Sequence, residues 1–125
     1  MTVKHSRPTS PHLQIYTLPL TGLISISHRI TGVLLSAGLL LVVCIFYAIS
    51  QGENSYAAMQ GVANFWFVKL MYWGFIYALF FHLCHGVRHL CWDIGEGFEA
   101  DKLHKYALIE LTAAFVLTLT TWIFI

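Results

Sequence analysis

The histidines in the segment 82–89 are the residues of this chain best suited to chemistry. His82, His85 and His89 stand close together, with Gly86 and Arg88 between them. On a helix that turns about 100° per residue, the three imidazoles and Gly86 share one face. Imidazole is the commonest metal ligand among side chains and also carries protons near neutral pH. The segment therefore predicts a helix face that binds a metal or handles protons.

The neighbours of His82 favour a flat ligand. Ala78 lies one helical turn before His82, and Gly86 lies one turn after it. Such small residues leave a clearing beside the imidazole against which a porphyrin can lie. The alternative is that Ala78 and Gly86 only allow close helix packing, with histidines hydrogen-bonded across helices. Close helix packing explains the presence of Gly86 well, but it explains poorly why the imidazole of His82 would be buried with almost no partner.

Depth along the helix separates the three histidines. His82 lies six residues before Arg88, which is about 9 Å along a helix. This depth suits a haem iron whose propionates reach back to a cationic rim, whereas His89 is too shallow and His85 is the second choice. Zinc bound by all three rings is an alternative, but imidazole sites normally recruit a carboxylate or another acceptor. The sequence therefore favours haem over zinc.

A second polar cluster, Ser25, His28 and Arg29, stands at the start of an apolar stretch. Ionisable groups at membrane depth are expensive and usually functional. The alternative for Arg29 and Arg88 is that both only reach out to lipid headgroups. Two clusters that both contain histidine favour a functional site over this alternative.

The composition shows which elements position these clusters. Of the 125 residues 58% are hydrophobic and only 10% are charged, against about 25% charged in ordinary soluble domains. A chain this short cannot bury so much apolar surface in its own core, and a bilayer-spanning helix needs about 20 apolar residues. We therefore predict an all-α membrane protein that is one anchor domain over residues 1–125. Its parts are an N-terminal segment 1–23 and three transmembrane helices at about 24–49, 65–90 and 106–125.

Charge sets the expected orientation. Lys69 alone among the 7 Lys and Arg residues belongs to the far side of the three spans. Loops on the cytoplasmic side carry the excess of Lys and Arg, which predicts a cytoplasmic or matrix N-terminus and puts both polar clusters at that face. The connectors are expected at the polar segment 50–55 and the charged segment 93–105. Glu110 is expected at headgroup level.

Several classes of protein are disfavoured. A net charge of +1 leaves no basic stripe for nucleic acid. The 3 cysteines contain no C-x-x-C pair, which excludes a disulfide framework and a thiolate zinc site. The first 17 residues lack the apolar core of a signal peptide. We therefore expect a complete chain from a bacterium or an organelle genome.

Three motifs resemble the succinate dehydrogenase cytochrome b subunit family. The segment 7–16 resembles that family's R-P-x-S-P-H-L-x-I-Y, and 25–32 resembles S-x-x-H-R-x-[ST]-G. The segment 82–95 resembles H-x-x-x-G-x-R-H-L-x-W-D-x-G. The motifs occur in the family's order, each on the expected side of its span, and the third span matches the family's three-helix plan.

The resemblance implies a role for each cluster. His82 would be one axial ligand of a haem b, and the other would come from a companion anchor subunit that completes the haem-binding bundle. Ser25 and Arg29 would help form a ubiquinone site, where a hydroxyl and a guanidinium stabilise charge developing on the quinone oxygens. His28, at the rim, is better placed to meet a haem propionate. His85 occupies a variable position of the motif and has no implied role.

The resemblance also implies the setting. The chain would anchor succinate dehydrogenase in the bacterial or mitochondrial inner membrane and accept electrons through flavoprotein and iron–sulfur subunits. Its partners would be those two subunits, the second small anchor subunit and lipid, and alone it would catalyse nothing. The alternative is a small transporter whose histidines relay protons, although repeat halves, which transporters usually show, are not visible. A reduced-minus-oxidised optical spectrum separates these two functions.

Overall fold

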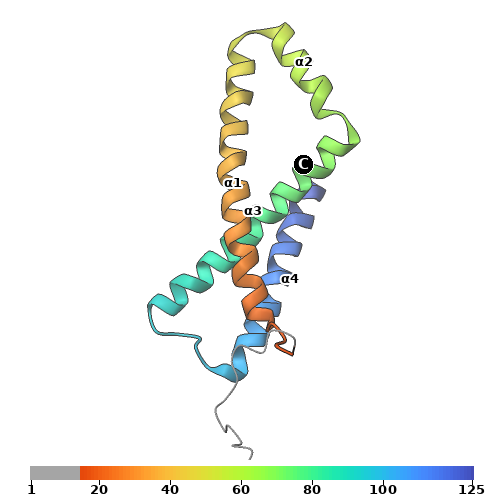
Figure 1. Cartoon of the computed structure of the whole chain (residues 1–125). Coiled ribbons are helices and arrows are strands. Elements are labelled where there is room, and N and C mark those ends of the chain that lie inside the picture. Colours follow the sequence, from red (N-terminus) through yellow and green to blue (C-terminus); the bar gives the residue numbers. More distant parts are fainter. Residues whose placement is uncertain (1–14) are drawn as a thin grey trace, which may run out of the picture.

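The structure, a computed structural model, describes residues 15–125, and within them every regular element is a helix. The helices are α1 (Leu20–Ser50), α2 (Glu53–Ala63), α3 (Trp66–Asp93) and α4 (Ala100–Phe124) (Figure 1). Three of them, α1, α3 and α4, are long and apolar enough to cross a membrane. The predicted all-α fold with three spans is confirmed. The N-terminal motif at positions 7–16 lies mostly outside the described residues.

The connection between the first two spans differs from the predicted loop. Only Gln51 and Gly52 separate α1 from α2, and Gly52 adopts φ 95°, a left-handed conformation that glycine enters without steric cost. Glu53 then opens α2, where an acidic side chain interacts favourably with the helix dipole. The polar residues at 53–55 suit a helix start as well as a loop, and the alanines that follow favour the helix.

The fourth helix begins earlier than the expected third span. α4 starts at Ala100, so part of the charged connector is helical, and Lys102 lies 3.0 Å from the carboxylate of Glu99. The indole Nε1 of Trp92 donates a hydrogen bond of 3.2 Å to the carbonyl of Gly97. This bond closes the turn between α3 and α4.

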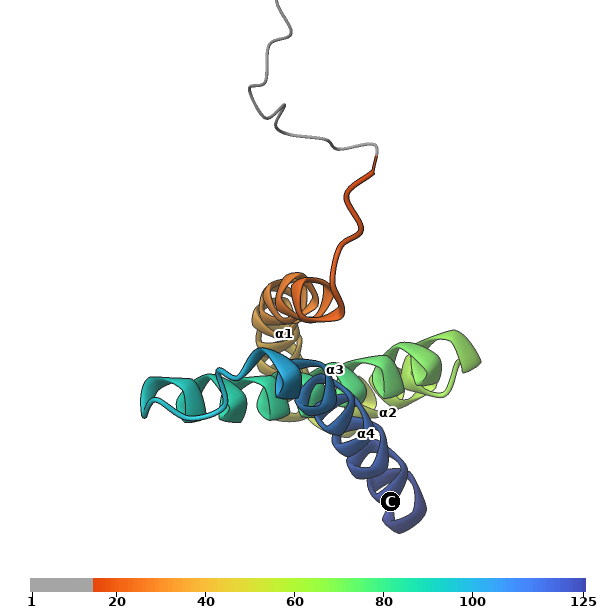
Figure 2. The same cartoon turned by 90° about the horizontal axis from the view of Figure 1, so that it is seen from below.

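Helix α3 is the centre of the bundle, with α1 and α4 both packed against it (Figures 1 and 2). The buried apolar cluster draws one residue from α1, one from α3 and two alanines from α4, namely Ile24, Phe81, Ala107 and Ala114. Small side chains let helix backbones approach closely in a membrane. Gly32 serves the same purpose on α1, since a Cβ there would lie 3.2 Å from Cε1 of His82. The close contacts therefore gather around the histidine segment of α3.

Candidate functional site

The two polar clusters of the sequence meet between α1 and α3. The ring of His28 stacks on that of His82, with centroids 4.0 Å apart and planes inclined by 13°. The His28 centroid is also 4.6 Å from that of His85 and 5.6 Å from that of His89. One ring from α1 thus lies against three from α3. The predicted common face of the α3 histidines is confirmed.

Thr31 fixes the orientation of His82. Its hydroxyl donates a hydrogen bond of 2.9 Å to the carbonyl of His28, and its Oγ1 lies 3.2 Å from Nδ1 of His82. Because the hydroxyl proton is already engaged, the oxygen accepts a hydrogen bond from Nδ1–H of His82. The lone pair of that imidazole is therefore on Nε2. A metal ligand needs such a second hydrogen bond to hold its tautomer.

A buried acid on α4 completes the site on the other side of α3. Glu110 is 5% exposed, and its two carboxylate oxygens lie 3.1 and 3.2 Å from Nδ1 of His85. His85 is 1% exposed, the most buried large side chain of the described residues. The carboxylate accepts a hydrogen bond from Nδ1–H of His85, which leaves the lone pair on Nε2 of this imidazole as well.

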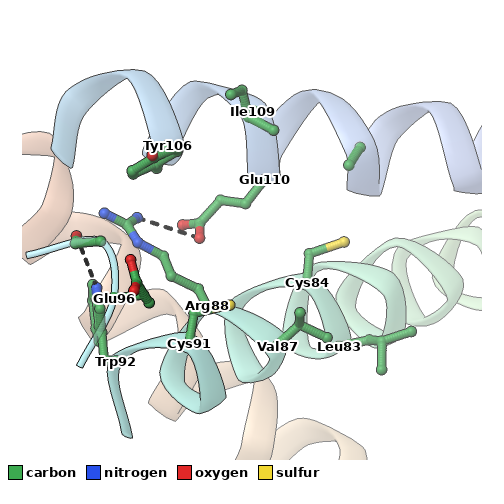
Figure 3. Close-up of a pocket in the computed structure, with 12 residues that line it drawn as sticks. Leu83, Cys84, Val87, Arg88, Cys91, Trp92, Glu96, Tyr106, Ile109 and Glu110 are labelled. Carbon is green, nitrogen blue, oxygen red and sulfur yellow. Dashed lines mark hydrogen bonds and ion pairs between the residues drawn. The ribbon is translucent and has the colours of Figure 1, made fainter. Parts of the chain in front are cut away.

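Arg88 joins the same group from one turn further along α3. Its Nη1 lies 3.3 Å from Oε2 of Glu110, an ion pair by distance although the angle is not that of a hydrogen bond. Its Nη2 donates a hydrogen bond of 3.1 Å to the carbonyl of Leu103, and the guanidinium stacks 4.8 Å from the ring centroid of Trp92. Figure 3 shows the Arg88–Glu110 pair at a largely apolar groove between α3 and α4.

The α3–α4 contact goes beyond what the sequence predicts. The sequence places Glu110 at headgroup level and makes His85 only the second choice for the iron ligand. The alternative that Arg88 reaches out to lipid headgroups is wrong, because Arg88 is 8% exposed and paired with Glu110. The available signal was one acid inside an otherwise uncharged stretch, which in a membrane segment calls for a cationic partner.

The residues proposed to bind quinone, Ser25 and Arg29, lie on α1 close to His28 in the sequence. Ser25 is half-buried one turn before His28, and Arg29 is exposed. The spacing of four residues places Ser25 and Arg29 as neighbours on the helix surface. The structure thus places the two on one stripe of α1, where Ser25 is the less exposed of the pair.

The residues present fit a haem at His82. A Cβ added to Gly86 would meet no atom within 4 Å, so this side of the predicted clearing is open, whereas Ala78 is covered and 8% exposed. Nε2 of His28 is buried and has no hydrogen-bond partner among the described residues. Such an orphaned donor is costly unless a ligand satisfies it. The open glycine therefore suits a flat ligand, and the unpartnered imidazole suits a polar group carried by that ligand.

Comparisons with known proteins agree with the resemblance seen in the motifs. A cytochrome b556 subunit of succinate dehydrogenase from Paracoccus denitrificans is 37% identical over 118 residues, covering 94% of this chain and 91% of the relative. The corresponding subunit of Rickettsia felis is 36% identical, covering 97% of this chain and 94% of the relative. The cytochrome b560 subunit of Reclinomonas americana is 36% identical, covering 94% and 85%.

The family model described as succinate dehydrogenase/fumarate reductase transmembrane subunit matches residues 3–121. It covers α1, α3, both polar clusters and α4 as far as residue 121. This match favours the anchor-subunit function over the alternative of a small proton-relaying transporter. The chain belongs to the succinate dehydrogenase/fumarate reductase transmembrane subunit family, and is therefore a membrane-anchoring subunit of an oxidoreductase rather than an enzyme by itself.

Proposed function

We propose that this chain binds haem b through His82 and helps form a ubiquinone-reduction site through Ser25 and Arg29. The observation that carries the haem assignment is the hydrogen bond between Thr31 and Nδ1 of His82, 3.2 Å long, which leaves Nε2 as the ligating nitrogen. The relatives are named cytochrome b subunits, which supports the same assignment. When bound, a haem with two histidine ligands supplies electron transfer rather than oxygen chemistry.

His28 would hold a haem propionate. Its Nε2 is buried without a partner, and its ring already lies against that of His82. A carboxylate is an acceptor that satisfies an imidazole N–H, and this hydrogen bond is stronger than one between neutral groups. The second axial ligand to iron would come from the companion anchor subunit.

Ser25 and Arg29 would bind the quinone headgroup. The hydroxyl of Ser25 donates a hydrogen bond to one carbonyl oxygen, and the guanidinium of Arg29 offsets negative charge as it develops there. Arg29 is exposed. A partner subunit or lipid would therefore have to cover it to exclude water from the site.

The same proposal includes the assembly and its orientation. The chain would form one anchor domain over residues 1–125, with its N-terminus on the cytoplasmic or matrix side of a bacterial or mitochondrial inner membrane. Its partners would be a second small anchor subunit, an iron–sulfur subunit and a flavoprotein subunit. The charge distribution, in which Lys69 alone belongs to the far side, supports this orientation.

The haem assignment is tested by a reduced-minus-oxidised spectrum of the purified complex. We expect His82→Ala to abolish the b-type signal, because His82 is the proposed ligand and Gly86, one helical turn after it, leaves open space for the haem. His104→Ala, at an exposed histidine of α4, is the control and should leave the spectrum unchanged. A full b-type signal in an assembled His82→Ala complex would overturn the assignment.

A further inference from the structure

We propose that the groove between α3 and α4 binds one phospholipid whose headgroup carries a primary ammonium, such as phosphatidylethanolamine. The groove has a volume of about 490 Å³, within the range of about 300–1,000 Å³ that small-molecule sites occupy. Its lining residues come from α3, α4 and their connector, and Ser25, His28, Arg29 and His82 are not among them. The site is therefore distinct from the haem and quinone sites proposed above.

The groove is polar at one end and apolar along the rest of its length. Arg88 and Glu96 lie at the end nearest the connector between α3 and α4, whereas Leu83 lies at the opposite end (Figure 3). Leu83 and Ile109, which are 55% and 52% exposed, keep the apolar walls open to the surrounding lipid. This polarity matches a lipid whose headgroup lies at the connector and whose acyl chain follows the helices.

A second hollow on α4 gives room for a second acyl chain. It shares Ile109 and Ala113 with the groove, and Lys105 lines its end nearest the connector. Ile109 and Ala113 are four residues apart and are therefore neighbours on the helix surface, with one apolar hollow on each side of them. The eight residues from Lys105 to Ala113 extend about 12 Å along the helix. A lipid with two chains can therefore lie across this pair with its phosphate between Arg88 and Lys105.

Arg88 has a buried donor that lacks an acceptor. The residue is 8% exposed, and its Nε has no hydrogen-bond partner among the described residues. Its Nη2 already donates to the carbonyl of Leu103, and its Nη1 lies 3.3 Å from Glu110 without the angle of a hydrogen bond. A buried donor without a partner is costly, and a guanidinium suits phosphate oxygens especially well. A phosphodiester at this end of the groove would satisfy Arg88.

Two further charges specify the headgroup. Within residues 15–125, Glu96 and Lys105 form no ion pair, whereas Glu110 is paired with Arg88. Lys105 would interact with the phosphate, and the carboxylate of Glu96 would accept hydrogen bonds from a primary ammonium. The trimethylammonium of phosphatidylcholine has no such donor, and phosphatidylglycerol would leave Glu96 without a cation. The two charges together therefore complement the zwitterion of phosphatidylethanolamine.

The test counts phospholipids bound to the purified complex by native mass spectrometry. The complex is washed in detergent and then incubated with equimolar phosphatidylethanolamine, phosphatidylcholine and phosphatidylglycerol that carry identical acyl chains. We expect one phosphatidylethanolamine per copy of this chain, preferred over phosphatidylcholine by about tenfold, the effect of one hydrogen bond to a charged group. Glu96→Ala should remove this preference but keep a phospholipid bound, and Lys105→Ala should weaken the binding of all three lipids.

Glu53→Ala and Lys69→Ala are matched controls, because each removes a charge of the same sign from an exposed residue at the other end of the bundle. Both should bind lipid as the parent does. Glu96 and Lys105 are exposed as well, so their replacement leaves the helix packing intact.

Three results would overturn the site. Equal binding of the three lipids by the parent, or unchanged binding in Glu96→Ala or Lys105→Ala, would leave only non-specific lipid around the helices. A parent complex that retains no phospholipid would show that something other than lipid, such as a partner subunit, covers the groove. The readout is lipid rather than haem or quinone, so its failure would leave the proposed function standing.

Discussion

The two ends of this helix bundle are held together in different ways. At the end that carries the histidines, α1, α3 and α4 contact one another through buried polar groups, including the pairs His28–His82 and His85–Glu110. At the other end, α1 and α3 diverge and the short helix α2 connects them (Figure 1). No residue of α2 is buried, and in α1 Ile24 alone is. The fold is thus specified at one end only.

The difference between the two ends follows from the lipid that surrounds the helices. In a bilayer, apolar side chains gain little by leaving lipid for a neighbouring helix, so hydrogen bonds and small residues decide which helices associate. The far half of α1 carries large exposed side chains, such as Leu40 and Phe46, which are 69% and 66% exposed. These side chains are suited to lipid or another subunit. Variants that weaken one end should therefore have effects different from those at the other.

Replacing the buried acid should have the largest effect. Glu110→Leu leaves Arg88 and His85 buried without their partner, and breaking a buried pair in this way costs about 3–5 kcal/mol. We expect loss of assembled complex or a large fall in its melting temperature. Glu110→Gln, which keeps a hydrogen-bonding side chain, should be milder. An assembled Glu110→Leu complex that melts with the parent would show that the polar end does not specify the fold.

Replacing Arg29, at the same end of the bundle, should lower quinone reduction without lowering stability. Because Arg29 is exposed whereas Arg88 is buried, Arg29→Leu should leave the melting temperature nearly unchanged. We expect quinone reduction to fall by about 10²–10³, the effect of removing one donor aimed at developing charge. Ser25→Ala should lower it less, since it removes a neutral hydrogen bond. Succinate-driven reduction of a dye that accepts electrons upstream is the control, and equal losses in both assays would contradict this role.

Substitutions at two glycines test whether the space beside each one is needed for helix packing or for a ligand. A Cβ at Gly38 would lie 2.6 Å from Cε1 of Phe75, whereas one at Gly86 would meet nothing within 4 Å. Gly38→Ala should therefore destabilise the complex by about 1–3 kcal/mol, as overpacking does. Gly86→Leu should leave the chain itself folded and lower its haem content. Normal haem in Gly86→Leu would show that the open space lies outside the haem site.

Thr31→Val should give the smallest of these effects. The variant keeps the shape of the side chain but removes the acceptor for Nδ1 of His82, a hydrogen bond of 3.2 Å. A lost hydrogen bond of this kind costs about 1 kcal/mol. We expect haem to remain bound with a shifted reduction potential, measured by redox titration. An unchanged potential would mean that Thr31 does not orient the ligand.

The histidine face was predictable and its partner on α4 was not. His82, His85 and His89 share a face through helical periodicity, a local property of one segment. The ion pair between Arg88 and Glu110 depends instead on the register of α3 against α4, which tertiary packing decides. Sequence showed that Glu110 was an acid in an apolar stretch, but it did not show the depth at which that acid would meet a cation.

The short helix was missed for a different reason. Polar residues at 53–55 are equally compatible with a loop and with the first turn of a helix, and none of the α2 residues is buried. With no apolar stripe packed on a core, periodicity gives little signal. The three long helices were easier to predict, because their length and hydropathy reflect the thickness of the bilayer rather than a particular contact.

The Arg88–Glu110 pair also has a consequence for biogenesis. The two charges stand on adjacent helices of one hairpin, and their nearest atoms are 3.3 Å apart. Entering the lipid separately, each would expose a full charge to hydrocarbon, whereas together they enter as a neutral unit. We therefore expect α3 and α4 to leave the insertion machinery as a hairpin. A nascent chain that stops before Glu110 is made should stay in contact with that machinery.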